Sequence, residues 1–135
     1  MSVGRNWRDA FAGGTEHGFG VSFADEVVLE ASVLAKPLVG RAVVQTVMAE
    51  ASRIYDSLAF THEADGAERT YLEWAATMPQ SERLFGVTVL TKGDDGAIVH
   101  IAIHHRPLGP ALRFSRELGV RLAGVVDPSH FHMEG

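Results

Sequence analysis

The fold is decided by the stretch between residues 58 and 106, LAFTHEADGAERTYLEWAATMPQSERLFGVTVLTKGDDGAIVHIAIHHR. Four of its segments alternate apolar and polar residues with a period of two, at residues 58–64, 68–78, 83–92 and 98–106. This period is typical of β-strands. Asp65-Gly66 is a strong hairpin signal, and Gly93-Asp94-Asp95-Gly96 is rich in residues that tolerate a positive φ. The stretch therefore predicts an antiparallel meander of four strands.

Helical signals flank this meander on both sides. The clearest covers residues 41–57, where apolar side chains recur at helical spacing. Shorter signals predict helical structure at residues 6–13 and 15–23 and in a C-terminal helix that begins near Pro110, and residues 27–29 predict one further strand. The pattern indicates an α+β protein. We expect a curved antiparallel sheet wrapped around the N-terminal and central helices, cone-shaped, with a pocket between sheet and helices.

Composition narrows the classes of function. The 135 residues predict a single domain, which we place at residues 1–126, followed by a flexible C-terminal tail at residues 127–135. The absence of cysteine excludes disulfides and cysteine-bound zinc, and a net charge of −5 is a poor match for nucleic acid or anionic lipid. No apolar run approaches the roughly 18 residues that span a bilayer, and the N-terminus lacks a signal-peptide core. We therefore expect a cytoplasmic protein without a membrane or nucleic-acid partner.

Several short motifs resemble the nuclear transport factor 2-like superfamily, which has a cystatin-like cone fold. They are Phe23-Ala24-Asp25-Glu26-Val27-Val28, Pro37 and Gly40-Arg41-Ala42. Later motifs resemble its SnoaL-like branch: Tyr71-Leu72-Glu73-Trp74, Asp95-Gly96-Ala97-Ile98 and Arg106-Pro107-Leu108. The resemblance spans about residues 7–125. It implies a deep apolar pocket for a small apolar organic ligand and a homodimer formed through the outer sheet face, but no single activity.

The ketosteroid-isomerase members of this superfamily hold an oxyanion with a tyrosine and a protonated aspartic acid, while an aspartate moves the proton. An ungapped comparison through Phe23-Ala24-Asp25 puts Trp7 at the tyrosine position and Thr88 near the oxyanion position. The proton-shuttling aspartate falls at Ala31. Because a methyl group cannot carry a proton, the resemblance does not imply isomerase chemistry of that type.

Two other chemistries of the superfamily match in part. For the limonene-epoxide-hydrolase members, Glu73 lies near one aspartate position, Tyr71 takes the place of the arginine, and Ile103 lies near the second aspartate. The polyketide-cyclase members use an acidic residue or a histidine to protonate a carbonyl, a role open to Glu73 or to a pocket histidine. Each resemblance lacks at least one required group.

Glu73 is the first candidate for a catalytic residue. Strand alternation places Tyr71 and Glu73 on one face and Leu72 and Trp74 on the other. The comparison with relatives turns the Glu73 face toward the pocket, where desolvation would raise the pKa of the carboxyl into the range of a general acid or base. The opposite phase, in which Leu72 and Trp74 face inward and Glu73 is solvated or paired with a surface arginine, is also consistent with hydrophobicity.

The last strand of the meander carries three histidines. His105 shares a face with Ile101 and Ile103 and is expected at the pocket rim, either transferring a proton or making structural hydrogen bonds. His100 and His104 lie on the opposite, outer face. They are about 13 Å apart along the strand, too far to share one metal ion.

We predict no metal ion and no cofactor. His130 and His132 form a His-x-His pair in the tail, but the sequence positions no acidic third ligand beside them. His17 lies near the expected mouth of the cone, where it contacts a ligand or is solvated. The remaining expected pocket residues are Trp7, Tyr55, Tyr71, Thr88, Leu90 and Ile103. Phe19 and Ile101 are expected in the ordinary core instead.

Two hypotheses of different class follow. The first is a cofactor-independent acid/base isomerase, cyclase or hydrolase acting on a small apolar organic molecule, in which Glu73 moves the proton, His105 assists, and Tyr71, Tyr55 or Trp7 stabilises a polarised oxygen. The second is a non-catalytic ligand-binding or dimerisation module. A protein scaffold that uses the outer sheet face is a further alternative.

Overall fold

A single mixed sheet forms the frame of the protein in a computed structural model that describes residues 3–133. Its strands are β1 (Phe23–Ala31), β2 (Leu38–Val39), β3 (Ser57–Asp65), β4 (Arg69–Met78), β5 (Glu82–Lys92) and β6 (Ile98–Arg106), in the order β2-β1-β6-β5-β4-β3. The strands β3 to β6 pair antiparallel, which confirms the predicted meander. β1 joins β6 in parallel, a pairing that the sequence did not predict. The fold class is the expected α+β.

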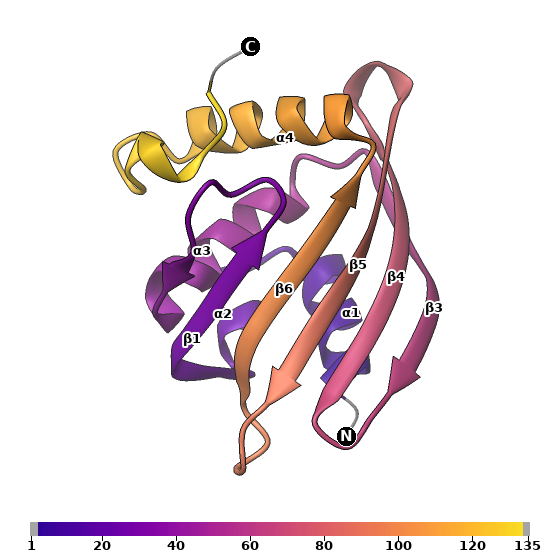
Figure 1. Cartoon of the computed structure of the whole chain (residues 1–135), viewed down its shortest axis with the longest axis vertical. Helices are drawn as coiled ribbons and strands as arrows, with labels where there is room; N and C mark the ends of the chain where they lie inside the picture. Colours follow the sequence, from indigo (N-terminus) through magenta and orange to yellow (C-terminus); the bar gives the residue numbers. More distant parts are fainter. Residues whose placement is uncertain (1–2, 134–135) are drawn as a thin grey trace.

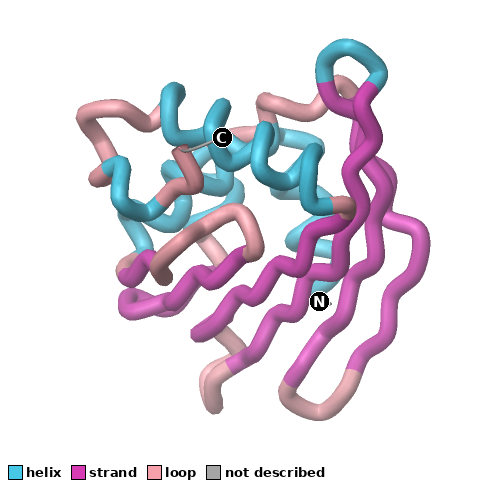
Figure 2. The backbone as a smooth tube through the Cα atoms, turned by 45° about the horizontal axis from the view of Figure 1, so that its top comes forward, coloured by secondary structure: helices cyan, strands magenta, loops and turns pink. Residues whose placement is uncertain are grey.

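Four helices accompany this sheet: α1 (Val3–Gly13), α2 (Glu16–Gly20), α3 (Arg41–Ser52) and α4 (Leu108–Arg121). The first three lie on one side of the sheet, behind it in Figure 1, and α4 crosses the end at which β6 finishes. Figure 2 shows the same arrangement turned by 45°, so that the end covered by α4 comes forward and the curvature of the sheet is visible. No described helix is long and apolar enough to cross a membrane.

The helix α3 ends at Ser52, five residues before the predicted end at residue 57. The amide of Asp56 donates a hydrogen bond of 2.8 Å to the carbonyl of Thr77 in β4, so the chain has already joined the sheet ladder there. Ile54 and Tyr55 keep their contacts with the core from the connecting segment. Their helical spacing reflected burial beside the helix, not membership of it.

The core lies between the sheet and the helices. Its most completely buried side chains include Leu72, Leu84, Leu90 and Ile101, one set of alternate residues on the inner face of β4, β5 and β6. Trp7, Phe19 and Phe23 form an aromatic group at the α1 and α2 side, with ring centroids 5.5 to 6.3 Å from Trp7. Burial of these large apolar groups is the main source of stability for a fold of this size.

Residues 127–133, which the sequence predicts to be part of a flexible tail, contact the rest of the protein. A short turn, η2 (Pro128–His130), leads into Phe131, which is buried and pairs with Leu34. The amide of Ala35 donates to the carbonyl of His130 at 2.7 Å. Burial of the apolar Phe131 side chain contributes to holding the tail against the rest of the protein. Residues 134–135 lie outside the described residues.

Ser115 of α4 ties this tail to the β1–β2 loop. Its hydroxyl donates to the carbonyl of Val33 at 2.6 Å and accepts from the amide of His132 at 2.8 Å. Ser115 is fully buried, so water cannot replace its hydroxyl as the partner of the Val33 carbonyl and the His132 amide. We name this connection between α4, the loop and the tail the Ser115 strap.

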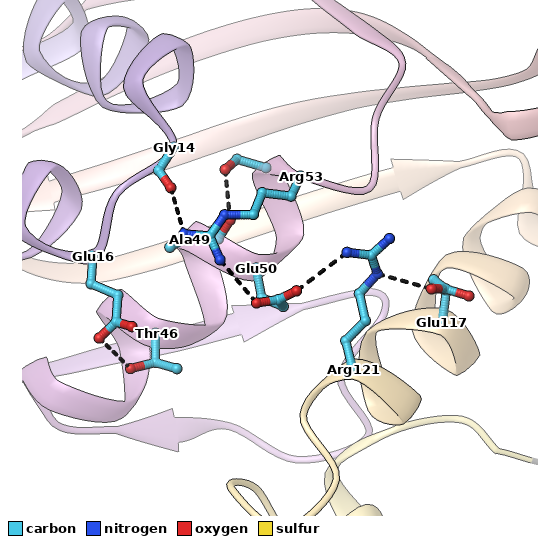
Figure 3. A network of polar contacts seen from close by, with 9 residues as sticks. Gly14, Glu16, Thr46, Ala49, Glu50, Arg53, Glu117 and Arg121 are labelled. Carbon is cyan, nitrogen blue, oxygen red and sulfur yellow. Dashed lines mark hydrogen bonds and ion pairs between the residues drawn. The ribbon is translucent and has the colours of Figure 1, made fainter.

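Polar contacts hold α3 against its neighbours on the other side (Figure 3). The carboxylate of Glu50 accepts from Arg53 at 3.1 Å and from Arg121 of α4 at 3.2 Å. Arg53 also donates to the carbonyl of Gly14 between α1 and α2, and Arg121 pairs with Glu117. Each such surface pair contributes little by itself, but the shared carboxylate links three helical segments.

We expect Ser115→Ala to lower the free energy of unfolding by about 1 to 3 kcal/mol, because it removes two hydrogen bonds to buried backbone groups. Urea unfolding measures this loss. Hydrogen exchange should quicken at the amides of Ala35 and His132, which the Ser115 strap holds. The control is Ser57→Ala at an exposed position, and an equal effect of both substitutions would contradict the role of the strap.

Candidate functional site

An apolar cavity lies between the inner face of the sheet and the helices. Its walls come from α1 (Phe11), from β1 and the loop after it, from α3, from β4 to β6, and from α4 (Phe114 and Leu118). The space between the lining atoms is about 420 Å³, which includes the opening, and about 30 Å³ of it can hold the centre of a water molecule. The expected pocket is therefore present, and it is narrow.

Four aromatic side chains pack in a closed circuit at one end of this cavity. Tyr55 stacks on Phe114 with 5.0 Å between ring centroids and meets Trp74 edge-on at 5.8 Å. His105 completes the circuit, 5.6 Å from Trp74 and 6.0 Å from Phe114. We name these four residues the aromatic wall. Their mutual contacts fix the ring positions, because offset and edge-to-face pairs are favourable geometries.

Polar atoms are few and gather beside the aromatic wall. The indole Nε1 of Trp74 donates to the hydroxyl of Thr88 at 3.1 Å, and both residues are buried. The Nδ1 atom of His105 is buried without a hydrogen-bond partner. Since buried polar atoms in proteins are almost always paired, this unpaired nitrogen marks the polar end of the cavity as incomplete.

Burial determines the charge state of His105. The pKa of His105 is lowered to about 4, mainly by desolvation and to a smaller extent by the neighbouring His104, whereas the backbone of Ile103 acts to raise the pKa. The imidazole is therefore neutral at pH 7 and offers one nitrogen that donates and one that accepts.

Tyr55 borders the cavity and the surface together. Burial raises the pKa of its hydroxyl, and no hydrogen bond contributes to that shift, so Tyr55 stays protonated at any ordinary pH. Tyr55 and Phe11 line the cavity and also a surface groove that contains Arg8, Asp56 and Phe60. The cavity approaches solvent at these two rings, whose centroids are 6.4 Å apart.

The expected inward phase of Glu73 is wrong. Its side chain is 52% exposed and pairs with Nδ1 of His62 at 2.8 Å on the outer sheet face. The opposite face of β4 buries Leu72 completely and leaves Trp74 4% exposed. Burial of these two apolar side chains is favourable, whereas burial of an unpaired carboxylate is costly, so β4 adopts the phase that hydrophobicity favours.

The same phase corrects two neighbours. Tyr71 is 40% exposed on the outer face and does not line the cavity, and Trp74, expected outside, is part of the aromatic wall. The sequence interpretation missed Trp74, Phe11 and Phe114 as cavity residues. The signal for Trp74 was present in the apolar alternation of β4.

The structure separates the other candidate residues into two groups. Tyr55, Thr88, Ile103 and His105 line the cavity. His17 is exposed on α2, while Trp7, Phe19, Leu90 and Ile101 are buried in the core beside the cavity without lining it. His100 pairs with Glu30 at 2.8 Å, across the neighbouring strands β6 and β1. Within residues 3–133 no group of three acidic or histidine side chains is arranged to hold a metal ion.

Comparison with known proteins identifies the fold. No family model matches the chain, and no curated protein matches it in sequence. An uncharacterized protein with a cystatin-like fold from Silicibacter pomeroyi DSS-3 is similar in structure, with a TM-score of 0.84, 16% identity, and 90% of this chain and 85% of that chain covered. A steroid delta-isomerase from Pseudomonas aeruginosa is also similar, with a TM-score of 0.80, 23% identity, and 89% of this chain and 88% of that chain covered.

A third similar structure is a protein with a ketosteroid isomerase-like fold from Catenulispora acidiphila DSM 44928, in complex with trimethylamine. Its TM-score is 0.67 at 15% identity, with 84% of this chain and 92% of that chain covered. These similarities confirm the expected cystatin-like, nuclear transport factor 2-like fold. Assignment to the SnoaL-like branch stays a prediction, because identities this low show the fold alone.

Because the folded protein lowers the pKa of His105, we expect acid to destabilise it through this residue. Between pH 6.5 and about pH 4 the unfolded chain binds a proton at His105 that the folded chain refuses, so stability falls as the pH falls. His105→Phe removes this contribution. From pH 7 to pH 4.5 the variant should lose less free energy of unfolding than the parent protein, by on the order of 2 kcal/mol.

Urea unfolding at the two pH values measures this difference. His17→Gln, at an exposed histidine, serves as the control and should follow the parent protein. Parallel pH dependence of His105→Phe and the parent would show that His105 titrates normally in the folded state.

Proposed function

We propose that this chain, with its cystatin-like fold, binds a small, uncharged and mostly apolar organic molecule in the cavity. One observation carries the proposal: none of the described residues that line the cavity is charged at pH 7. Transfer of an ion from water into such a space has no opposite charge to compensate it. For an apolar molecule, in contrast, each part of its surface that leaves water makes the free energy of binding more favourable.

The narrow interior limits the size of the ligand. The volume open to the centre of a water molecule is about 30 Å³, and a cavity of this size fits a single ring better than a fused ring system. The complex of the Catenulispora acidiphila protein with trimethylamine supports a small molecule as the occupant of this fold. Trimethylamine is protonated and positively charged at neutral pH, and the cavity of this chain offers no opposite charge, so we expect this chain to take a neutral molecule of comparable size.

The acid/base enzyme hypothesis requires a carboxylate in the cavity, and Glu73 lies outside the cavity. Ala31, at the position that corresponds to the proton-shuttling aspartate of ketosteroid isomerases, lines the cavity with a methyl group. His105 is the remaining group that could accept a proton, and its low pKa makes it a weak base at pH 7. Ligand binding without catalysis is therefore the function that we propose.

We further propose that the outer sheet face forms a homodimer. Phe85, Val87 and Val89 form an apolar stripe along the middle strand β5, all of them only half-buried. Arg83 and Arg106 lie over the Phe85 ring at 5.2 and 4.9 Å, whereas Glu73 stands beside Val87 and Glu30 lies level with Val89 in the sheet. A two-fold rotation can place basic and acidic ends together, which supports a second copy as the partner.

A residue that fills the cavity should abolish binding. Ala51 lines the cavity from α3, and Ala51→Leu adds three heavy atoms to its narrow interior. The probe is cyclohexanol, and the signal is the indole ¹H–¹⁵N resonance of Trp74, with Trp7 outside the cavity as internal reference. We expect saturable shifts at Trp74 in the parent protein and at least a tenfold weaker affinity in Ala51→Leu.

The matched control is Ala42→Leu on the exposed face of α3, which should bind like the parent protein. Cyclohexylammonium and cyclohexanecarboxylate should bind at least tenfold more weakly than cyclohexanol, because the cavity lining carries no opposite charge. Equal binding of the three probes would contradict an uncharged ligand.

Val87→Asp should dissociate the dimer, because it places a charge in the centre of the apolar stripe beside Glu73. Sedimentation velocity should show a dimer for the parent protein and a monomer for the variant. Val120→Asp, at an exposed position of α4, is the control and should remain dimeric. A parent protein that sediments as a monomer would refute this part of the proposal.

A further inference from the structure

The polar end of the cavity owes its geometry to a glycine. In the register of β4 and β5, Trp74 stands opposite Gly86, and Leu72 opposite Thr88. A Cβ atom at Gly86 would lie 2.2 Å from Cζ2 of Trp74, so only glycine leaves room for the indole ring there. The indole therefore lies across β5 and reaches the hydroxyl of Thr88, one inward position further along that strand.

The hydrogen bond from Trp74 orients the hydroxyl of Thr88. An indole Nε1 can only donate, so Thr88 Oγ1 accepts, and its own hydrogen points elsewhere. No acceptor for that hydrogen is found among residues 3–133. Thr88 is 1% exposed and lines the cavity, so its hydroxyl donor is buried and unused.

The unpaired Nδ1 atom of His105 lies at the same end of the cavity. Thr88 pairs with Ile103 in the β5–β6 ladder, and His105 is the next inward residue of β6. Inward side chains in this diagonal relation are close enough to contact one small group between them. Two buried polar groups from neighbouring strands thus lie in a diagonal relation on the inner face, and no hydrogen bond joins them.

We propose that Thr88 and His105 form a subsite for one uncharged oxygen atom of the ligand. This inference rests on the proposed binding function and adds to it the class of the ligand: a small alicyclic or aromatic alcohol or ketone. The oxygen accepts a hydrogen bond from the Thr88 hydroxyl. A hydroxyl ligand also donates to Nδ1 when that nitrogen is the acceptor, and a carbonyl accepts from it when it is the donor.

Trp74 acts in this subsite as a positioning residue. Its N–H occupies a lone pair of Thr88 Oγ1 and leaves the hydroxyl hydrogen for the ligand. A donor that is held in place before binding loses less freedom when the ligand arrives. The remaining lining is apolar, so selectivity for an oxygenated ligand over a hydrocarbon depends on these polar groups.

The test compares cyclohexane, cyclohexanol and cyclohexanone, which share one ring and differ in oxygen. Affinities for the parent protein and for Thr88→Val are measured through the Trp74 indole resonance. Thr88→Val keeps the shape of the side chain but removes its hydroxyl. We expect it to weaken the affinity for cyclohexanol and cyclohexanone about three- to tenfold, because one neutral hydrogen bond is lost. Cyclohexane should bind both proteins equally.

Thr88→Ser is the matched control, because it restores the hydroxyl and should recover the affinity for both oxygenated probes. His105→Phe retains an aromatic ring and removes Nδ1, and it should weaken at least one of the two oxygenated probes without weakening cyclohexane. Urea unfolding confirms that each variant is folded at the temperature of the titration.

Three outcomes distinguish a failure of the oxygen subsite from a failure of the binding function. Selective loss of the oxygenated probes supports the subsite. Equal changes for cyclohexane and cyclohexanol in both Thr88→Val and His105→Phe would overturn it and leave the apolar cavity as a binding site. If none of the probes moves the Trp74 resonance of the parent protein, the proposed binding function fails, and the subsite fails with it.

Discussion

The packing of the Trp74 indole across Gly86 is the constraint on which the rest of the structure depends. It fixes which face of β4 meets the helices, because a strand shifted in phase by one residue would expose the indole and bury a carboxylate. The choice at β4 passes through the ladder to β5 and β6, where Thr88 and His105 then face inward. One aromatic contact with a glycine therefore defines both the cavity and its polar end.

The sequence predicted the parts of the fold that depend on local patterns. The meander of residues 58–106 follows from its period and turns, and Asp65-Gly66 marks the hairpin between β3 and β4. The parallel pairing of β1 with β6 could not be predicted, because two strands that are distant in sequence carry no local signal that identifies them as partners. The end of α3 was also missed, since Ile54 and Tyr55 keep helical spacing after the chain has left the helix.

The candidate site was predictable only in part, for a reason that Glu73 makes plain. The alternation of β4 gave two faces, and the resemblance to relatives selected the face with the carboxylate, whereas apolar burial selected the face with Trp74. A motif shared with relatives indicates a position in the fold, but the burial free energy of this chain's own side chains decides the direction. Tyr55, Thr88, Ile103 and His105 line the cavity as predicted. The resemblance placed Thr88 and Ile103, and alternation along the strand placed His105 on the same face as Ile103.

The two sides of the cavity that approach the surface are held by different forces. On one side, Ala31 and Leu34 separate the cavity from a groove at Lys36 and Pro37, and the Ser115 strap holds that loop with backbone hydrogen bonds and the buried Phe131. On the other side, Phe11 and Tyr55 are held by ring packing. Ring packing adapts by rotamer changes, whereas the strap opens only if several hydrogen bonds break together. The cavity is thus bounded by backbone hydrogen bonds at its C-terminal side and by side chains alone between Phe11 and Tyr55.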